Sequence, residues 1–112
     1  MPTSMTDEVM RGLIATARNY TFVILHPTPR RQEPGADQVV WEHARRNFEL
    51  RAEKRLSIVC PVRDGSDVCG MYLFPGTPEE TALIMEGDPG VKAGIFTYDV
   101  HPCRGFPGDA LP

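Results

Sequence analysis

Hydrophobic residues recur along the chain at two spacings, one typical of helices and one typical of strands. A repeat of three to four residues predicts a helix over residues 5–18, with Val9, Leu13 and Ala17 on one face. Because this face is strongly apolar, we expect the helix to pack against another surface, at the seam of a dimer. A second repeat predicts a helix over residues 37–54. Its apolar row consists of Val40, Ala44, Phe48 and Ala52, with Trp41 beside it.

Short β-rich runs that end at proline or glycine lie between and after these helices. The predicted strands cover residues 20–26, 56–61, 68–74 and 95–101. Turn-forming residues at 63–66 predict a hairpin between the second and third strands. Thr77 and Glu80 have the spacing of a capping box, which predicts a third helix that ends at Gly87. Residues 27–35 are rich in turn-forming residues and are the expected mobile loop.

The order of these elements predicts the fold class. After the leading helix the chain runs strand, helix, strand, strand, helix, strand. This order suits a ferredoxin-like α+β fold, in which helices cover one face of a four-stranded antiparallel sheet. The 112 residues fit a single domain. We divide it into an N-terminal helical extension (1–19), a core (20–104) and an irregular tail (105–112).

The strand predicted at residues 68–74 is apolar on both of its sides. The helices of a ferredoxin-like fold cover only one face of the sheet, so the other face needs a different cover. A second copy of the chain can provide it, because apolar patches of this kind mark subunit contacts. The pattern therefore predicts a homodimer.

The formal net charge of −3 argues against one class of partner. The arginine pairs at 30–31 and 45–46 have glutamates among them, whereas a nucleic-acid surface needs unpaired Lys and Arg. The apolar runs, of which residues 22–25 are typical, are too short to span a bilayer. We therefore expect no nucleic-acid partner and no membrane partner.

Cysteine usage and the start of the sequence indicate the compartment. Cys60, Cys69 and Cys103 are an odd number and have no CxxC spacing, which is typical of reduced thiols. The first residues carry Asp7 and Glu8 and lack the apolar core of a secretion signal. These features predict a cytoplasmic protein.

Two polar residues fall inside the apolar arc of the second predicted helix. At 100° per residue His43 and Asn47 lie among its apolar positions, and Arg51 follows at the next step of four. One interpretation is a histidine at the edge of the core that binds a backbone carbonyl. The other is an imidazole that faces a cleft, flanked by an amide and a guanidinium. There it can move protons, because imidazole ionises near neutral pH.

A second polar feature is Asp88, which precedes Pro89 in a turn of two glycines. Asp88 is well explained as the cap of a short helical turn. A carboxylate at this position can also orient an imidazole or stabilise its charged form. The residues alone do not establish whether Asp88 and His43 meet.

A metal site and a nucleophilic cysteine find little support. Among the histidines and cysteines only His101 and Cys103 lie close in sequence, and their spacing matches no zinc motif. Cys60 lies in a predicted strand next to Pro61 with nothing nearby to activate it, so we expect a small apolar filler. We expect neither a metal nor another cofactor.

One ordered set of residues resembles a known family. The set runs from His43 through Leu50, Leu56 and Pro61 to Asp64–Gly65, Gly70, Asp88–Gly94 and Val100–Pro102. Its most specific part is the block Asp-Pro-x-Val-Lys-Ala-Gly, which is followed by a strand that ends in His-Pro. These residues resemble the YCII-related (YciI-like) family over residues 20–104.

The resemblance implies a ferredoxin-like domain that pairs as a dimeric α+β barrel, with a site centred on His43 and Asp88. Related dimeric barrels include isomerases and lyases of aromatic degradation. The chain departs from the family pattern where Asn47 replaces a leucine, Lys54 a helix-ending glycine and Cys60 a glycine. We expect a left-handed backbone at Lys54, and a narrower, more polar pocket because of the other two residues.

Two classes of function follow. In the first, the protein is a small-molecule isomerase or lyase that needs no cofactor, with His43 as general acid and base and Asp88 as its orienting partner. Its substrate is a small organic molecule, anionic or phenolic. The expected substrate contacts are Asn47, Arg51, Ser57, Cys60 and Pro61. In the second, the protein is a non-catalytic ligand-binding or dimeric interaction module. A purely oligomeric scaffold, the third alternative, predicts no pocket beside His43.

Overall fold

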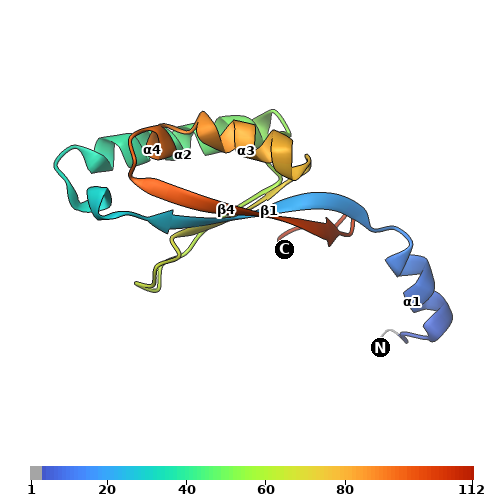
Figure 1. Ribbon diagram of the computed structural model, residues 1–112. Helices are drawn as coiled ribbons and strands as arrows, with labels where there is room; N and C mark the ends of the chain where they lie inside the picture. Colours follow the sequence, from blue (N-terminus) through green and yellow to red (C-terminus); the bar gives the residue numbers. More distant parts are fainter. Residues whose placement is uncertain (1–3) are drawn as a thin grey trace.

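The computed structural model describes residues 4–112 as a four-stranded antiparallel sheet with helices on one face (Figure 1). The elements are α1 (Asp7–Ile14), β1 (Arg18–Pro27), the 3-10 helix η1 (Pro29–Gln32), α2 (Ala36–Ala52), β2 (Ile58–Pro61), β3 (Gly70–Phe74), α3 (Pro78–Glu86), α4 (Pro89–Lys92) and β4 (Phe96–Gly105). The strand order is β2-β3-β1-β4, and every neighbouring pair is antiparallel. This is the ferredoxin-like α+β fold with an extra N-terminal helix, as the sequence predicts.

The core lies between the sheet and the helices. Along β1, Thr21, Val23 and Leu25 are buried while the residues between them are only half-buried, because alternate side chains of a strand point to opposite faces. The same alternation buries Tyr72 and Phe74 on β3. Ala36, Leu50, Leu56, Met85 and Ile95 from the helices and their connections, with Phe96 at the start of β4, complete the core.

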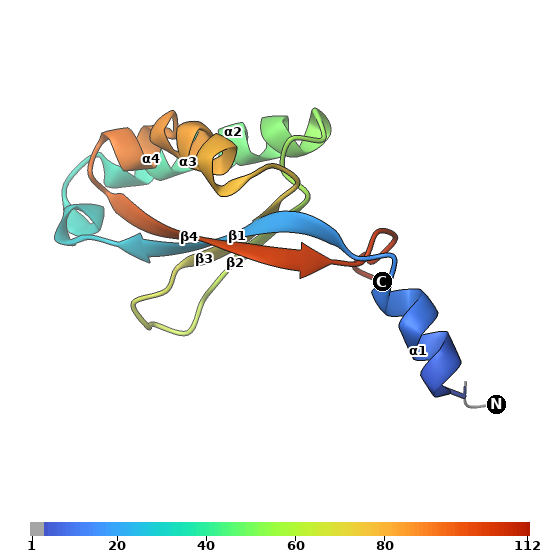
Figure 2. The same ribbon diagram turned by 45° about the vertical axis from the view of Figure 1, so that its right-hand side comes forward.

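The other face of the sheet is open. Figures 1 and 2 show α2, α3 and α4 together on one face of the sheet. Within residues 4–112, no helix covers the other face. The strand register places Phe22 and Ile24 of β1 and Met71 and Leu73 of β3 on this open face. Four neighbouring apolar side chains are thus left without a covering layer.

The last strand is longer than the sequence predicts. The expectation that it ends at His101 is wrong, because β4 continues to Gly105 and pairs with β1 as far as Arg18. Pro102 does not interrupt this pairing. β4 lies at the edge of the sheet, where a residue that lacks an N–H can direct that side away from its only neighbouring strand.

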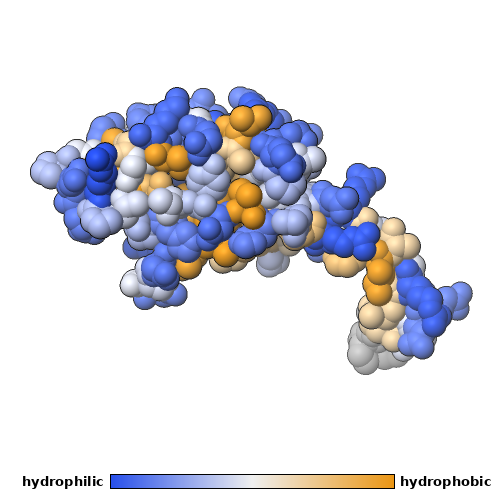
Figure 3. Space-filling model, in the orientation of Figure 1, coloured by the Kyte–Doolittle hydropathy of each residue, from blue (hydrophilic) through white to orange (hydrophobic). Residues whose placement is uncertain are grey.

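The N-terminal helix projects from the end of β1. α1 is shorter than predicted, and Thr6 caps it by accepting the N–H of Val9 at 3.2 Å. None of its side chains is buried; Leu13 and Ile14, for example, are 48% and 51% exposed. Figure 3 shows hydrophobic side chains along one side of this projecting helix. It does not bury this face on the remainder of residues 4–112, so a place at a dimer seam stays a prediction.

The segment expected to be a mobile loop is ordered by hydrogen bonds. It contains η1, and Thr28 caps this short helix by accepting the N–H of Arg30. The Thr28 hydroxyl donates to the carbonyl of Gly94, and the Arg30 guanidinium donates to the carbonyl of Ala93. These contacts connect the segment to the end of α4.

The local signals at the helix ends are confirmed. The Thr77 hydroxyl accepts the N–H of Glu80, and the Glu80 carboxylate accepts the N–H of Thr77, which completes the capping box. Lys54 has a φ of 61°, the left-handed conformation that the missing glycine predicts. No helix within residues 4–112 has both the length and the apolar character that crossing a membrane requires.

The apolar row predicted for the second helix is wrong. Trp41 and Phe48 are 63% and 54% exposed, so neither belongs to the core. The buried positions of α2 are Ala36, His43, Asn47 and Leu50. This helix therefore turns two polar side chains toward the sheet and leaves its aromatic residues outside.

Candidate active site

His43 and Asp88 form a buried hydrogen-bonded pair. Nδ1 of His43, on α2, lies 2.7 Å from Oδ1 of Asp88, which precedes α4. Their side chains are 8% and 1% exposed, so the protein replaces almost all of the water around both groups. The structure thus brings together two residues that the sequence reasoning could not place relative to each other.

The start of α4 positions the Asp88 side chain. Asp88 is the N-cap, and its Oδ2 accepts the N–H groups of Gly90 and Val91 at 2.9 and 3.1 Å. Gly90 has to be small, because a Cβ atom there would overlap the ring of Phe96. The capping role of Asp88 and its contact with His43 therefore occur together, one on each carboxylate oxygen.

The second nitrogen of His43 faces two further polar groups. Nε2 lies 3.1 Å from the Tyr72 hydroxyl oxygen and 3.3 Å from Nδ2 of Asn47. A carboxylate only accepts hydrogen bonds, so Nδ1 carries the proton that Asp88 receives. The Asn47 amide nitrogen only donates, so Nε2 presents a lone pair to it. From this network we assign a neutral imidazole with its proton on Nδ1.

The hydroxyl group of Tyr72 keeps its proton at this buried position. Burial raises the pKa of Tyr72 well above its ordinary value, while the hydrogen bond from Asn47 opposes this shift. Gly70 leaves room for the hydroxyl, since a Cβ atom at Gly70 would lie 2.9 Å from the Tyr72 oxygen. At neutral pH, Tyr72 therefore offers an O–H donor beside Nε2 of His43.

A cavity of about 260 Å³ opens beside these groups. His43, Asn47 and Tyr72 line it, and Arg31 adds a cation. The other lining residues are apolar or weakly polar: Leu25, Val40, Ala44, Phe48, Val59, Pro61, Cys69 and Phe96. The Arg31 guanidinium pairs with Asp37, whose side chain is 94% exposed, at 2.8 Å. Exposed pairs of this kind are weak, so the guanidinium is free to turn toward an anionic ligand.

Of the five expected substrate contacts, Asn47 and Pro61 line this cavity. Cys60 does not, because the β2–β3 register places it opposite Met71, on the open face of the sheet. Tyr72 occupies the neighbouring register position on the face that carries the cavity. The sheet therefore separates the Cys60 thiol from His43 within one chain.

The remaining two expected contacts also lie outside the cavity. Ser57 and Arg51 are exposed, and the Arg51 guanidinium carbon lies 4.8 Å from the centre of the Phe48 ring. Arg51, four positions after Asn47 on α2, thus lies outside the cavity. Within one chain the structure does not bring Arg51, Ser57 or Cys60 to His43.

The sequence analysis missed two polar residues that the structure places at the cavity. Tyr72 was grouped with the apolar residues of its strand, although a phenol on a buried face needs a hydrogen-bond partner. That requirement was the available signal. Arg31 belonged to the segment taken as a mobile loop, and no local pattern connects such a residue to His43, twelve positions further along the chain. Tertiary packing places both residues at the cavity.

The described thiols and carboxylates give no metal centre. Among residues 4–112 no group of three or more His, Cys, Asp or Glu side chains is placed to hold a metal ion. Cys69 lines the cavity, but burial raises the pKa of its thiol, and nearby Arg31 offsets this only in part. Such a thiol is a poor nucleophile.

Comparisons with known proteins give a structural likeness. No family model and no curated protein matches the chain. The chain is similar to a solved structure of 5-chloro-2-hydroxyhydroquinone dehydrochlorinase from Burkholderia phenoliruptrix, in complex with 2,5-dihydroxybenzoquinone. The match has 19% sequence identity and a TM-score of 0.47, and it covers 73% of this chain and 90% of that chain. The resemblance to the YciI-like family stays a prediction.

Proposed function

We propose that the protein is a cofactor-independent isomerase or lyase in which His43 moves a proton of a small organic substrate. One observation carries this proposal: Asp88 holds the Nδ1 side of the buried ring at 2.7 Å, while the lone pair of Nε2 meets only the Asn47 amide and the Tyr72 hydroxyl, two groups that line the cavity and that a substrate can displace. A histidine that only filled the core would need no cavity on its second nitrogen. General bases require this combination of a fixed orientation and an accessible lone pair.

The neighbouring groups suit the separation of charge that proton transfer creates. When Nε2 takes a proton from the substrate, the imidazole becomes positive, and Asp88 stabilises that charge across the bond to Nδ1. The electrons left on the substrate move to an adjacent oxygen, which the Tyr72 hydroxyl can stabilise as a hydrogen-bond donor. Return of the proton from Nε2 to another atom completes an isomerisation. Loss of a leaving group from the anion completes an elimination.

The walls of the cavity indicate the class of substrate. Most of them are apolar, including the ring of Phe96 and the side chains of Leu25 and Val59, so they favour a flat organic body over a sugar. Arg31 adds a positive charge for a carboxylate or a phenolate. A volume of about 260 Å³ limits the substrate to the size of a single substituted ring. We propose a small phenolic or enolisable ring compound.

Proton exchange tests this proposal without knowledge of the natural substrate. Wild-type protein is incubated in D₂O with a panel of phenolic and enolisable ring compounds, and deuterium uptake at carbon is followed by NMR. We expect His43→Gln to lower the rate on any active compound 10²- to 10⁴-fold, the usual contribution of a general base. The matched control is His26→Gln, which changes a histidine on the opposite face of the sheet from the cavity and should leave the rate unchanged.

A companion variant tests the role of Asp88 in the same assay. Asp88→Asn has a single side-chain oxygen, and when that oxygen caps α4 the NH₂ group faces Nδ1 of His43 and cannot accept its proton. The imidazole should then carry its proton on Nε2, which ¹⁵N NMR of the ring detects, and exchange should fall with it. If compounds bind the wild type but none exchanges, the non-catalytic binding module is the correct alternative. If His43→Gln exchanges at the wild-type rate, His43 is not the general base and the proposal is wrong.

We also propose that two copies pair through the open face of the sheet, as in a dimeric α+β barrel. The unpartnered side chains of Phe22, Ile24, Met71 and Leu73 support this pairing. Light scattering should give twice the chain mass, and Met71→Lys should give the mass of a monomer because it buries a charge at the seam. Leu83→Lys, on the exposed side of α3, is the matched control and should stay dimeric. A monomeric wild type at micromolar concentration would contradict the pairing.

A further inference from the structure

A second cavity lies on the helical side of the molecule, between α2 and α3. It has a volume of about 520 Å³, twice that of the His43 cavity. Its lining residues are Arg46, Lys54, Arg55, Pro75, Gly76, Glu80, Leu83 and Ile84. None of these residues lines the His43 cavity, so the two cavities are separate. We refer to the eight residues as the basic cleft.

Positive charge is concentrated in the basic cleft. Three cations and one carboxylate line it, which gives a formal charge of +2 in a chain whose net charge is −3. The carboxylate belongs to Glu80, and its Oε1 is already the acceptor of the Thr77 N–H in the capping box. The chain therefore places an excess of cations in a concave surface, against its overall charge.

The cations of the basic cleft are poorly neutralised by the protein itself. Arg46 forms no ion pair and no side-chain hydrogen bond with any residue in the range 4–112, although it is only partly exposed. Arg55 has one carboxylate neighbour, Glu53, at 3.6 Å, and both side chains of that pair are more than half exposed. Such a pair contributes little and is easily exchanged for a better acceptor.

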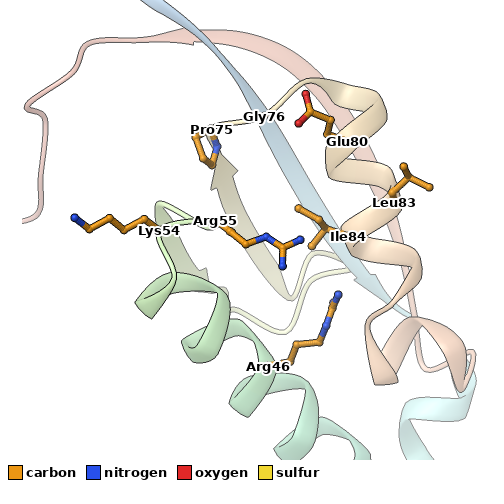
Figure 4. A pocket seen from close by; sticks show the side chains of 8 residues that line it. All are labelled: Arg46, Lys54, Arg55, Pro75, Gly76, Glu80, Leu83 and Ile84. Carbon is orange, nitrogen blue, oxygen red and sulfur yellow. The ribbon is translucent and has the colours of Figure 1, made fainter.

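Two guanidinium groups converge in the middle of the basic cleft. Figure 4 shows the side chains of Arg46, from α2, and Arg55, from the turn after it, directed toward the same part of the cavity, whereas Lys54 extends away. Like charges placed together repel each other, more strongly where water is partly excluded. An anion between the two groups would convert this repulsion into attraction.

A purely structural role explains only part of the cluster. Lys54 and Arg55 follow the C-terminus of α2, where positive charge complements the helix dipole. Arg46 lies six positions before the last residue of α2, Ala52, outside the reach of the α2 dipole, and the helix end that it meets is that of α3, whose C-cap is Gly87. The Arg46 guanidinium lies against Gly87, where a Cβ atom would be 2.8 Å from Nη2. A glycine at this point leaves the space that holds the Arg46 guanidinium at the basic cleft.

We propose that the basic cleft binds a small organic molecule through a phosphate or another doubly charged oxyanion group. Arginine is suited to this ligand, because its planar fork donates two parallel hydrogen bonds to an oxyanion. The apolar side chains of Leu83, Ile84 and Pro75 line the same cavity and offer a surface for the organic part. The ligand's anionic group lies between Arg46 and Arg55, and its organic part lies toward α3.

Phenyl phosphate is a suitable probe, with inorganic phosphate and phenol as its two halves. Isothermal titration of the wild-type protein should give saturable binding of phenyl phosphate and weaker binding of inorganic phosphate. Phenol alone should give no binding that depends on the arginines of the basic cleft. Arg46→Gln and Arg55→Gln should each weaken phenyl phosphate binding at least tenfold. The matched control is Arg45→Gln, at the position of α2 just before Arg46. The Arg45 guanidinium pairs with Glu42 and does not line the basic cleft. The affinity of Arg45→Gln should equal that of the wild type.

A second control separates this proposal from the proposed acid–base function. Phenyl phosphate could also enter the other cavity through Arg31, so Arg31→Gln and His43→Gln are titrated as well and should keep wild-type affinity. Thermal unfolding of each variant establishes that the affinities are compared between folded proteins. The proposal is overturned if saturable binding is absent, if Arg45→Gln weakens binding as much as Arg46→Gln, or if only Arg31→Gln abolishes it.

Discussion

Two histidines of this protein each contact an aspartate at 2.7 Å, and their surroundings are opposite. His43 and Asp88 are 8% and 1% exposed at the base of a cavity. His26 and Asp99 lie on the open face of the sheet, with side chains 27% and 57% exposed. Distance alone therefore does not distinguish these two pairs. Their difference lies in burial and in what the second ring nitrogen meets.

The partner of the ring nitrogen that does not face the aspartate indicates a different protonation state for each of the two histidines. In His26, Nδ1 faces the carbonyl oxygen of Asp67 at 2.8 Å and Nε2 faces the Asp99 carboxylate, so both nitrogens face acceptors. Both must donate, which describes a positively charged imidazolium. In agreement with this, the hydrogen bond to Asp99 raises the pKa of His26 above its ordinary value. In His43, Nδ1 faces the Asp88 carboxylate, whereas Nε2 faces the Asn47 amide nitrogen, which only donates, so we assign a neutral ring with a lone pair on Nε2.

The comparison explains why only one pair suits proton transfer. The His26 ring uses both nitrogens as donors, so it has no lone pair to offer. The His43 ring uses one nitrogen for orientation and keeps the other for a ligand. Burying the His43–Asp88 pair costs much free energy, because the loss of water around a carboxylate is offset only by its hydrogen bonds. A protein that needed only a stable core would place apolar residues there.

The largest expected difference between the two pairs is in stability. Asp88→Ala removes the cap of α4, with two N–H groups, and leaves the buried Nδ1 proton of His43 without an acceptor. We expect a loss of about 3 kcal/mol in the free energy of unfolding. Asp99→Ala is the matched variant and should cost less than about 1 kcal/mol, since that pair is exposed. Urea denaturation measures both values, and equal losses would refute the distinction.

The fold could be predicted because its signals are local. Proline and glycine separate the strands from the helices, and the capping box at Thr77 and Glu80 marks the start of a helix from residues three positions apart. Lys54 was expected to be left-handed because the family that the chain resembles has a helix-ending glycine at this position. The last strand was cut short because Pro102 was taken as a strand end. Only the position of β4 at the edge of the sheet, which is not a local property, allows the strand to continue.

The candidate site was predictable only in part. The inward position of His43 and Asn47 follows from helical geometry, since both fall in the apolar arc of α2 and both are buried. The pairing of His43 with Asp88 joins residues 45 positions apart, and only the family resemblance suggested it. The same arc wrongly placed Phe48 in the core. Which side of a helix is buried depends on where it rests on the sheet, and periodicity alone does not determine that.

The smallest expected effect is a pH dependence that belongs to His26 alone. Because the folded-state pKa of His26 is raised, its contribution to stability is fully present below the unfolded-state value of about 6.5 and is lost as the pH rises through the folded-state value. The difference in unfolding free energy between wild type and His26→Gln should therefore be largest near pH 6 and should shrink toward pH 9. We expect a change of only a few tenths of a kcal/mol, since the pair is partly exposed and screened. Denaturation at a series of pH values, repeated in 0.5 M salt, measures it. A difference that grew with pH would mean that His26 is neutral in the folded protein, and the contrast with His43 would then rest on burial alone.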